Sequence, residues 1–162
     1  MPAGSNVTSV VIAGLGGHGV LKASDILAEV AFRAGLDVKK SEVHGMSQRG
    51  GSVASDVRFG SEVLSPMAPA GEADFLVVVA AGQVENNRWQ LRPGGVLIEP
   101  GQIDTRRLRS ERSLNVALLG RLSRYLNFPE SLWQEAIRAH LPAKLHEVNL
   151  RAFALGRASQ DR

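Results

Sequence analysis

Residues 9–19, SVVIAGLGGHG, decide the fold of this chain. They begin with a short apolar, β-branched run that stops at Gly14, a pattern typical of a buried strand in a parallel sheet. The glycine-rich segment is followed by residues 20–34, where apolar side chains recur at steps of three and four, as in an amphipathic helix. Gly35 suits the left-handed cap that ends such a helix. The stretch therefore predicts a strand, a tight turn and a helix.

The rest of the chain continues this alternation of strands and helices. Further strands are expected at 37–43, 52–59, 75–80 and 96–98, and helices at 83–91, 116–126, 129–140 and 144–155. Gly60-Ser61 is expected to turn the 52–59 strand into a hairpin with 62–64, and Pro93-Gly94-Gly95 indicates another turn. We therefore expect an α/β fold: a single Rossmann-like domain with a mainly parallel sheet, an inserted β-hairpin and a helical C-terminal tail.

Length and composition indicate one domain without a membrane span. A chain of 162 residues, 44% of them hydrophobic, can bury one core but hardly two. We expect a single domain over 1–162, with an α/β core at about 9–100 and a mainly helical tail at about 101–162 whose last residues, 159–162, fray. No apolar run reaches the roughly 18 residues of a membrane span and 1–9 do not resemble a signal peptide, so a cytoplasmic protein is expected.

The chain contains no cysteine. Disulfides, a thiolate nucleophile and an all-cysteine zinc or iron–sulfur site are therefore excluded within it, and any thiolate-held redox centre must belong to a partner. His18 and His44 lack histidines or carboxylates at ligand spacing. We expect both to be hydrogen-bonded structural histidines, and we expect no catalytic residue and no metal ligand in this chain.

The formal charge of +3 comes more from arginine than from lysine. Four arginines crowd together in the sequence: Arg106, Arg107, Arg109 and Arg112. Nucleic acid is disfavoured as their partner, because acidic residues interrupt the cluster and aromatic residues for base stacking are scarce nearby. A solvated face or a docking surface for an acidic partner is the favoured interpretation.

The glycines of the first turn have two interpretations. Gly14, Gly16, Gly17 and Gly19 satisfy G-x-G-x-x-G between a strand and a helix, the context of a dinucleotide-binding turn. That site also needs an acidic residue at the end of the second strand, where Glu42 would serve only if the strand ended there. Alternatively, the glycines permit close packing of the helix, the strand or a second subunit, and both interpretations stay open.

A second glycine-rich stretch follows the second expected strand. It reads HGMSQRGG and comprises His44, Gly45, Met46, Ser47, Gln48, Arg49, Gly50 and Gly51. Its glycines allow a tight bend that exposes amide groups, and Arg49 can bind a carboxylate or phosphate with two parallel hydrogen bonds. Because loops after strands carry the sites of such folds, we favour a functional loop over an ordinary turn whose Arg49 pairs with Asp56 or Glu42.

Several stretches together resemble the gamma-type subunit or domain of 2-oxoacid:ferredoxin oxidoreductases, the pyruvate/ketoisovalerate oxidoreductase gamma family. They are GLGGHGVLKASDILAEVAFRAG (14–35), SEVHGMSQRGGSVASDVRFG (41–60), the Ser65-Pro66 loop, GEADFLVVV (71–79) and LRPGGVLI (91–98). Within that family the HGMSQRGG phrase is most similar to the beta subunit of indolepyruvate ferredoxin oxidoreductase. The resemblance covers about 9–100 closely and the tail loosely. Residues 80–87, AAGQVENN, depart from the indolepyruvate type.

The resemblance implies a thiamine-diphosphate enzyme that oxidatively decarboxylates indolepyruvate or another arylpyruvate, reduces ferredoxin through iron–sulfur clusters and forms an acyl-coenzyme A. It also implies that thiamine diphosphate and the clusters lie on a partner subunit, so that this chain is an accessory subunit, inactive alone, with ferredoxin as an indirect partner. The four turn glycines and the loop 44–51 would then shape the subunit interface and approach the active site or coenzyme A. An exposed apolar surface, able to drive self-association into a homo-oligomer, is expected.

Two other functions remain open at this point. One is a free-standing nucleotide-binding dehydrogenase, which the glycine turn favours. The other is a nucleic-acid or regulatory binding module, which the arginine cluster favours.

Overall fold

The computed structural model describes residues 6–44 and 51–161, and residues 1–5, 45–50 and 162 lie outside the description. The sheet consists of β1 (Thr8–Leu15), β2 (Asp37–His44), β3 (Ser52–Gly60), β4 (Ala73–Val78) and β5 (Leu91–Ile98), in the order β2-β3-β1-β4-β5. Strands β1, β4 and β5 are parallel, whereas β3 is antiparallel to both of its neighbours. The expected α/β fold with a mainly parallel strand direction is confirmed.

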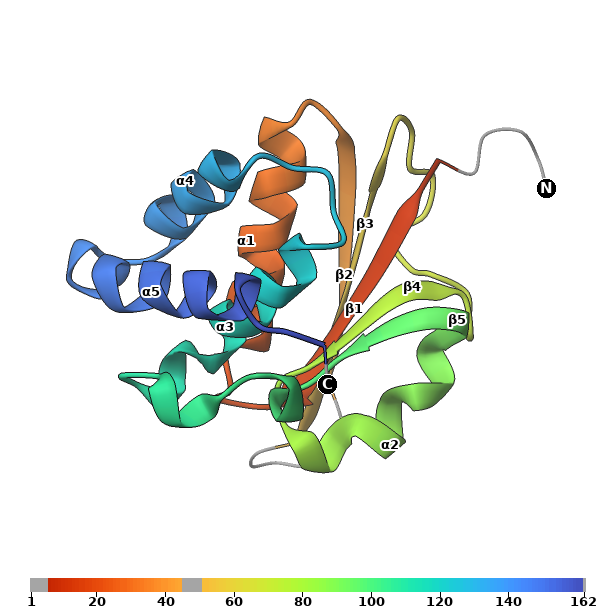
Figure 1. The fold of residues 1–162 in the computed structure, drawn as a ribbon. Helices are drawn as coiled ribbons and strands as arrows, with labels where there is room; N and C mark the ends of the chain where they lie inside the picture. Colours follow the sequence, from red (N-terminus) through yellow and green to blue (C-terminus); the bar gives the residue numbers. More distant parts are fainter. Residues whose placement is uncertain (1–5, 45–50, 162) are drawn as a thin grey trace.

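The helices are unequally divided between the two faces of the sheet (Figure 1). They are α1 (Val20–Arg33), α2 (Val84–Asn87), α3 (Leu114–Ser123), α4 (Glu130–His140) and α5 (His146–Arg157). Four of them, α1, α3, α4 and α5, lie on one face and form the main core with it, centred on buried side chains such as Ile12, Trp133 and Phe153. The short α2 lies on the other face, where Val84 packs against Val11 and Leu76. No helix of the described chain is long and apolar enough to cross a membrane.

Helix α1 forms where its periodic pattern predicts. Its buried side chains, including Ile26, Leu27 and Val30, face the sheet and α4. Gly35, with φ of 86°, ends the helix, and the amide of Leu36 donates to the Ala31 carbonyl oxygen at 3.1 Å. The expected left-handed glycine cap is therefore confirmed.

The expected hairpin of 52–59 with 62–64 is wrong, because β3 already has two neighbours. It pairs with β2 from Gly60 opposite Asp37 to Val53 opposite His44, and with β1 along its other edge. No edge of β3 is left for 62–64. Val63 is instead buried, and its amide donates to Asp37 Oδ2 at 2.7 Å. The inserted hairpin is β2 with β3, and the HGMSQRGG stretch connects them.

The turn expected at Pro93-Gly94-Gly95 is also corrected. These residues do not separate two elements but lie inside β5, where the register slips between Ala73 opposite Leu91 and Phe75 opposite Val96. Gly94 has φ of 78°, which lets the chain bulge and resume pairing.

The fraying expected at residues 159–162 is not seen at 159–161, the part of this end that the structure describes. Arg121, whose side chain is 5% exposed, donates to Ser159 Oγ at 2.8 Å and to Asp161 Oδ1 at 2.7 Å. A buried guanidinium must have its donors satisfied, so the tail is held against α3 by that requirement.

Candidate functional site

The two glycine-rich stretches meet at one edge of the sheet. Leu15, at the end of β1, pairs with Ser52, at the start of β3, and the amide of Gly16 donates to the Gly51 carbonyl oxygen at 2.9 Å. His44, the last residue of β2, lies opposite Val53 on the other side of β3. The turn after β1 and both ends of the HGMSQRGG stretch are therefore neighbours, as the sequence predicts for loops at the carboxyl ends of strands. Most of that stretch lies outside the described residues: Gly45, Met46, Ser47, Gln48, Arg49 and Gly50.

The turn glycines differ in why they are needed. A Cβ on Gly14 would come within 3.0 Å of Val20 Cγ2, so Gly14 permits the start of α1 to pack on β1. Gly17, with φ of 88°, has open space around it and is required by its backbone conformation. Gly19 combines both reasons, because its φ is 76° and a Cβ there would strike Asn115 from α3. Close packing thus accounts for Gly14 and in part for Gly19, whereas Gly17 is free to face a ligand.

The topology does not support the dinucleotide interpretation of the turn. Strand β3 lies between β1 and β2, so Glu42 is opposite Ser55, which in turn is opposite Ile12. Strand β2 also continues to His44, so Glu42 is not at its end. Glu42 is instead 3.9 Å from Lys40 Nζ and 3.9 Å from His44 Nε2. The acidic residue that a ribose needs is therefore absent from the turn among the described residues.

The two histidines near this edge are open to solvent. His18 is exposed in the turn, and the side chain of His44 is 60% exposed, 3.9 Å from Glu42 Oε2. Within 6–44 and 51–161, no group of three or more histidines, aspartates or glutamates is arranged to hold a metal ion. The expected role of His18 and His44 as hydrogen-bonded structural histidines stays a prediction.

A cavity of about 340 Å³ opens next to the loop ends, on the face of the sheet that carries only α2. Val43 and Ser52 line it from the strands that flank the loop, and Met67 and Trp89 line it from the far side. Val43 is 53%, Met67 49% and Trp89 63% exposed, which is high for large apolar side chains close to one another. The expected exposed apolar surface is therefore present, and we call these three residues and the cavity the open face.

Asp56 gives the open face one buried carboxyl group. Its side chain lines the cavity, it is only 9% exposed, and Oδ2 accepts a hydrogen bond from the Ala68 amide at 3.2 Å. Burial raises the pKa of this carboxyl above its ordinary value, against smaller opposing effects of that hydrogen bond and of Arg58. The alternation of 52–59 already placed Asp56 on the side away from the main core, but no sequence signal showed that Met67 and Trp89 would enclose it.

A comparison with protein families decides the relationship. The model of the family described as pyruvate ferredoxin/flavodoxin oxidoreductase matches residues 9–102, which include both glycine-rich stretches and, apart from Thr8, all five strands of the sheet. The chain belongs to the pyruvate ferredoxin/flavodoxin oxidoreductase family.

Relatives in this oxidoreductase family match nearly the whole chain. Indolepyruvate oxidoreductase subunit IorB of Thermococcus kodakarensis is 36% identical over 91% of this chain and 93% of its own length. Among solved structures, the gamma subunit of a keto/oxoacid ferredoxin oxidoreductase from Geobacter sulfurreducens matches 94% of this chain and 95% of its own, with a TM-score of 0.77 and 20% identity.

A longer member of the oxidoreductase family is also similar. The 2-oxoglutarate:ferredoxin oxidoreductase of Magnetococcus marinus, solved with 2-oxoglutarate, coenzyme A and succinyl-CoA bound, gives a TM-score of 0.80 and 25% identity over 95% of this chain. The present chain spans 31% of that larger chain. Homologues of this chain are thus subunits or parts of oxidoreductase complexes.

Proposed function

We propose that this chain is the accessory subunit of a thiamine-diphosphate-dependent 2-oxoacid:ferredoxin oxidoreductase that acts on indolepyruvate or another arylpyruvate. The holoenzyme would decarboxylate the 2-oxoacid oxidatively, form an acyl-coenzyme A and reduce ferredoxin. Family membership and the 36% identity to an indolepyruvate oxidoreductase subunit support this proposal. The observation that carries it is the hydrogen bond between Gly16 and Gly51, which joins the two glycine-rich stretches at one edge of the sheet.

The residues of this chain do not fit the redox cofactors of such an enzyme. Iron–sulfur clusters are held by thiolates, and the chain has no cysteine. That thiamine diphosphate also lies on a partner subunit is what the family resemblance implies. We therefore assign both cofactors to a partner subunit, and no step of the electron transfer to this chain.

Coenzyme A fits the exposed part of the glycine turn better. Gly17 is surrounded by open space and His18 is exposed, while Asn115 closes the side of Gly19. Glycines without side chains let backbone amides approach a phosphate closely, and Arg49 in the adjoining stretch could bind a phosphate or carboxylate with two hydrogen bonds. The contribution of this chain would be to bind and orient a substrate at the edge of the partner's active site.

The open face supplies the surface for that partner. Val43 and Ser52 line its cavity and directly precede and follow the HGMSQRGG stretch in the sequence, so a subunit docked there would lie next to both ends of the stretch. Apolar aromatic and methionine side chains surrounded by polar ones are typical of the centre of a protein interface. We assign the open face to the thiamine- and cluster-bearing subunit.

Co-purification with this partner tests the proposal. A tagged chain produced in its native cells should carry a subunit that shows the visible absorption of iron–sulfur clusters and contains thiamine diphosphate. The complex should reduce ferredoxin with indolepyruvate and coenzyme A, and the chain alone should not.

Arg49→Ala should lower that ferredoxin-reducing activity or the assembly of the complex while leaving the thermal unfolding of the isolated chain unchanged. A chain that purifies alone and binds nicotinamide or flavin dinucleotides at micromolar concentration would overturn the proposal in favour of a dehydrogenase.

A further inference from the structure

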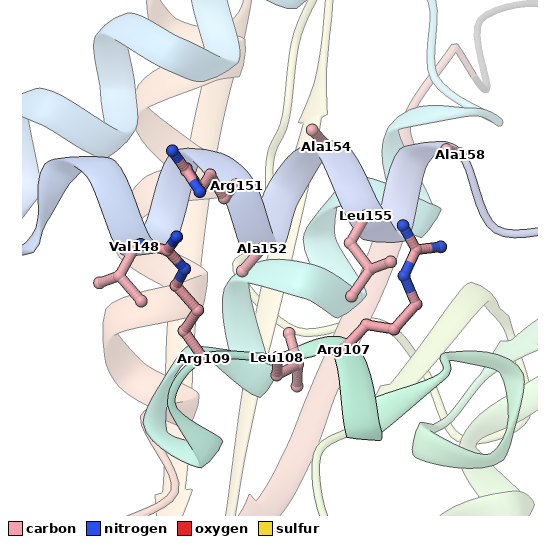
Figure 2. A pocket seen from close by; sticks show the side chains of 9 residues that line it. All are labelled: Arg107, Leu108, Arg109, Val148, Arg151, Ala152, Ala154, Leu155 and Ala158. Atoms are coloured by element: carbon pink, nitrogen blue, oxygen red, sulfur yellow. The ribbon is translucent and has the colours of Figure 1, made fainter.

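A groove on the helical side of the molecule gathers three arginines (Figure 2). It has a volume of about 350 Å³ and lies between the 105–110 segment and α5. We call it the basic groove and define it by Arg107, Leu108, Arg109, Arg151, Ala154 and Leu155. It belongs to neither the glycine turn nor the open face, and the proposed function makes no use of it.

The charges of the basic groove are all positive. Arginine is the only charged residue type among those that line it. Asp104, just before this segment, is bound by Arg106 at 3.0 Å. That hydrogen bond is the main reason why the pKa of the Asp104 carboxyl is lowered, and the charge of Arg107 lowers it further by a smaller amount. Arg107 and Arg109 make no ion pair with any residue of the described ranges. Among the described residues, Arg109 therefore has no ion-pair partner, and Arg107 has only a weaker attraction to Asp104, which is already bound by Arg106.

Arg151 is also available, although it has a local partner. It lies 2.9 Å from Glu147 on the same helix, and both side chains are more than half exposed, at 57% and 72%. Such a pair one helical turn apart is weak in water and rearranges at little cost when another carboxylate approaches.

The floor of the groove is apolar. Leu108 and Leu155 pack against the main core, Ala152 is 3% exposed, and Ala154 is small and exposed. Figure 2 shows Arg109 and Arg151 near one end of the groove, Arg107 at the other and Leu108 between them. The resulting pattern is cation, apolar centre, cation.

We propose that the basic groove binds an acidic amphipathic segment of a partner protein, with carboxylates on either side of an apolar side chain. Carboxylates would accept paired hydrogen bonds from the guanidinium groups, and the apolar side chain would cover Leu108 and Leu155. The apolar floor favours this ligand over a free phosphate, because a phosphate would leave Leu108 and Leu155 in contact with water. Nucleic acid is disfavoured because none of the lining residues is aromatic, so bases would have nothing on which to stack.

The test measures binding of labelled peptides to the purified full chain by fluorescence anisotropy. A peptide of repeated Glu-Leu-Leu-Glu units should bind about tenfold more tightly than a polyglutamate of the same length, because only the first covers the apolar floor. The variant Arg107→Ala/Arg109→Ala should weaken binding of the Glu-Leu-Leu-Glu peptide about tenfold or more. Arg106→Ala is the matched control, since it removes a neighbouring arginine that is already paired with Asp104 and does not line the groove.

A second variant separates shape from charge. Ala154→Gln keeps all the arginines, suits a helix and extends a longer side chain over the groove. It should weaken binding of the Glu-Leu-Leu-Glu peptide several-fold and leave binding of polyglutamate unchanged. Equal losses with Arg106→Ala and the double variant would overturn the proposal, as would equal binding of both peptides or no binding at all. Effective competition by inorganic phosphate or by single-stranded DNA would assign the groove to those ligands instead.

Discussion

The Nδ2 atom of Asn115 donates a hydrogen bond to the carbonyl oxygen of Gly19 at 3.0 Å, and so the first turn of α3 holds the residue that immediately precedes α1. The same side chain occupies the space that a Cβ on Gly19 would need. Asn115 is only 6% exposed, and its Oδ1 accepts a hydrogen bond from the Val116 amide at 2.9 Å, so it has little freedom to move away.

We expect Gly19→Ala to cost more stability than Gly17→Ala. Both residues have positive φ, and alanine in that conformation costs about 1 kcal/mol, but only Gly19 adds a steric conflict, for a total of about 2–3 kcal/mol. Urea unfolding of the two variants measures the difference. Combining each with Asn115→Ala should show coupling for Gly19 and none for Gly17, and equal coupling would contradict this account.

The contact between α3 and α5 should tolerate no added methyl group. A Cβ on Gly156 would strike the carbonyl oxygen of Ala117, and a backbone atom cannot turn aside as a side chain does. Gly156→Ala should therefore lower the free energy of unfolding by about 3 kcal/mol. Gly82→Ala is the control, because a Cβ there would meet no heavy atom within 4 Å and the φ of Gly82 is not positive. Equal changes in melting temperature for Gly156→Ala and Gly82→Ala would refute the packing argument.

The predictable part of the fold is the part written in local periodicity. Helix α1 is expected at 20–34 and runs from Val20 to Arg33, because one face of it is buried and its pattern records that burial. The partners of β3 do not follow from the sequence, since strand order depends on contacts between distant residues that no local pattern encodes. Residues 62–64 have a strand-like composition, yet both edges of β3 are already taken.

The candidate site shows the same division. The sequence places Gly16 and Gly51 in two loops at strand ends, and the structure joins them directly. The sequence also shows the arginines of 106–112 as a cluster. It does not show that α5 brings Arg151 close to them or that Arg106 is paired with Asp104. Burial of an isolated polar residue, such as Arg121 or Asp56, likewise depends on tertiary contacts that single positions in a sequence do not reveal.

The Asp56 carboxyl should make the free energy of unfolding fall as the pH rises. Burial raises its pKa in the folded state above the ordinary value of 3.8, so the folded state holds the proton more tightly than the unfolded chain. The stabilisation is therefore complete below pH 3.8 and is lost as the pH rises through the folded pKa.

Replacing this carboxyl tests the sign of that effect. Asp56→Asn keeps an oxygen that can accept the hydrogen bond from the Ala68 amide and removes the buried charge. It should raise the free energy of unfolding at pH 7 by about 1 kcal/mol and change it little at pH 3, as followed by urea denaturation at both values. A loss of stability at pH 7 would show that the charge is neutralised by a partner within the chain. Asp74→Asn, whose carboxylate is paired with Arg92 at 2.9 Å, is the control and should not stabilise.

Trp89 should be the strongest single contact of the open face with its partner subunit. Its ring is 63% exposed, and its Nε1 donates to the Asn86 carbonyl oxygen at 2.9 Å, so the side chain is already oriented before a partner arrives. Trp89→Glu should weaken association with the thiamine- and cluster-bearing subunit by about thirtyfold, the usual cost of losing a central interface tryptophan, and should leave the melting temperature of the isolated chain unchanged.

Phe32→Glu provides the control for that measurement. Phe32 is 71% exposed, so the substitution introduces the same charge at an equally exposed aromatic residue, but on α1, on the opposite side of the sheet. Association measured by surface plasmon resonance should be retained in Phe32→Glu and lost in Trp89→Glu. If Phe32→Glu is the variant that loses the partner, the interface lies on the helical side, because a charge matters only where water is excluded from around it.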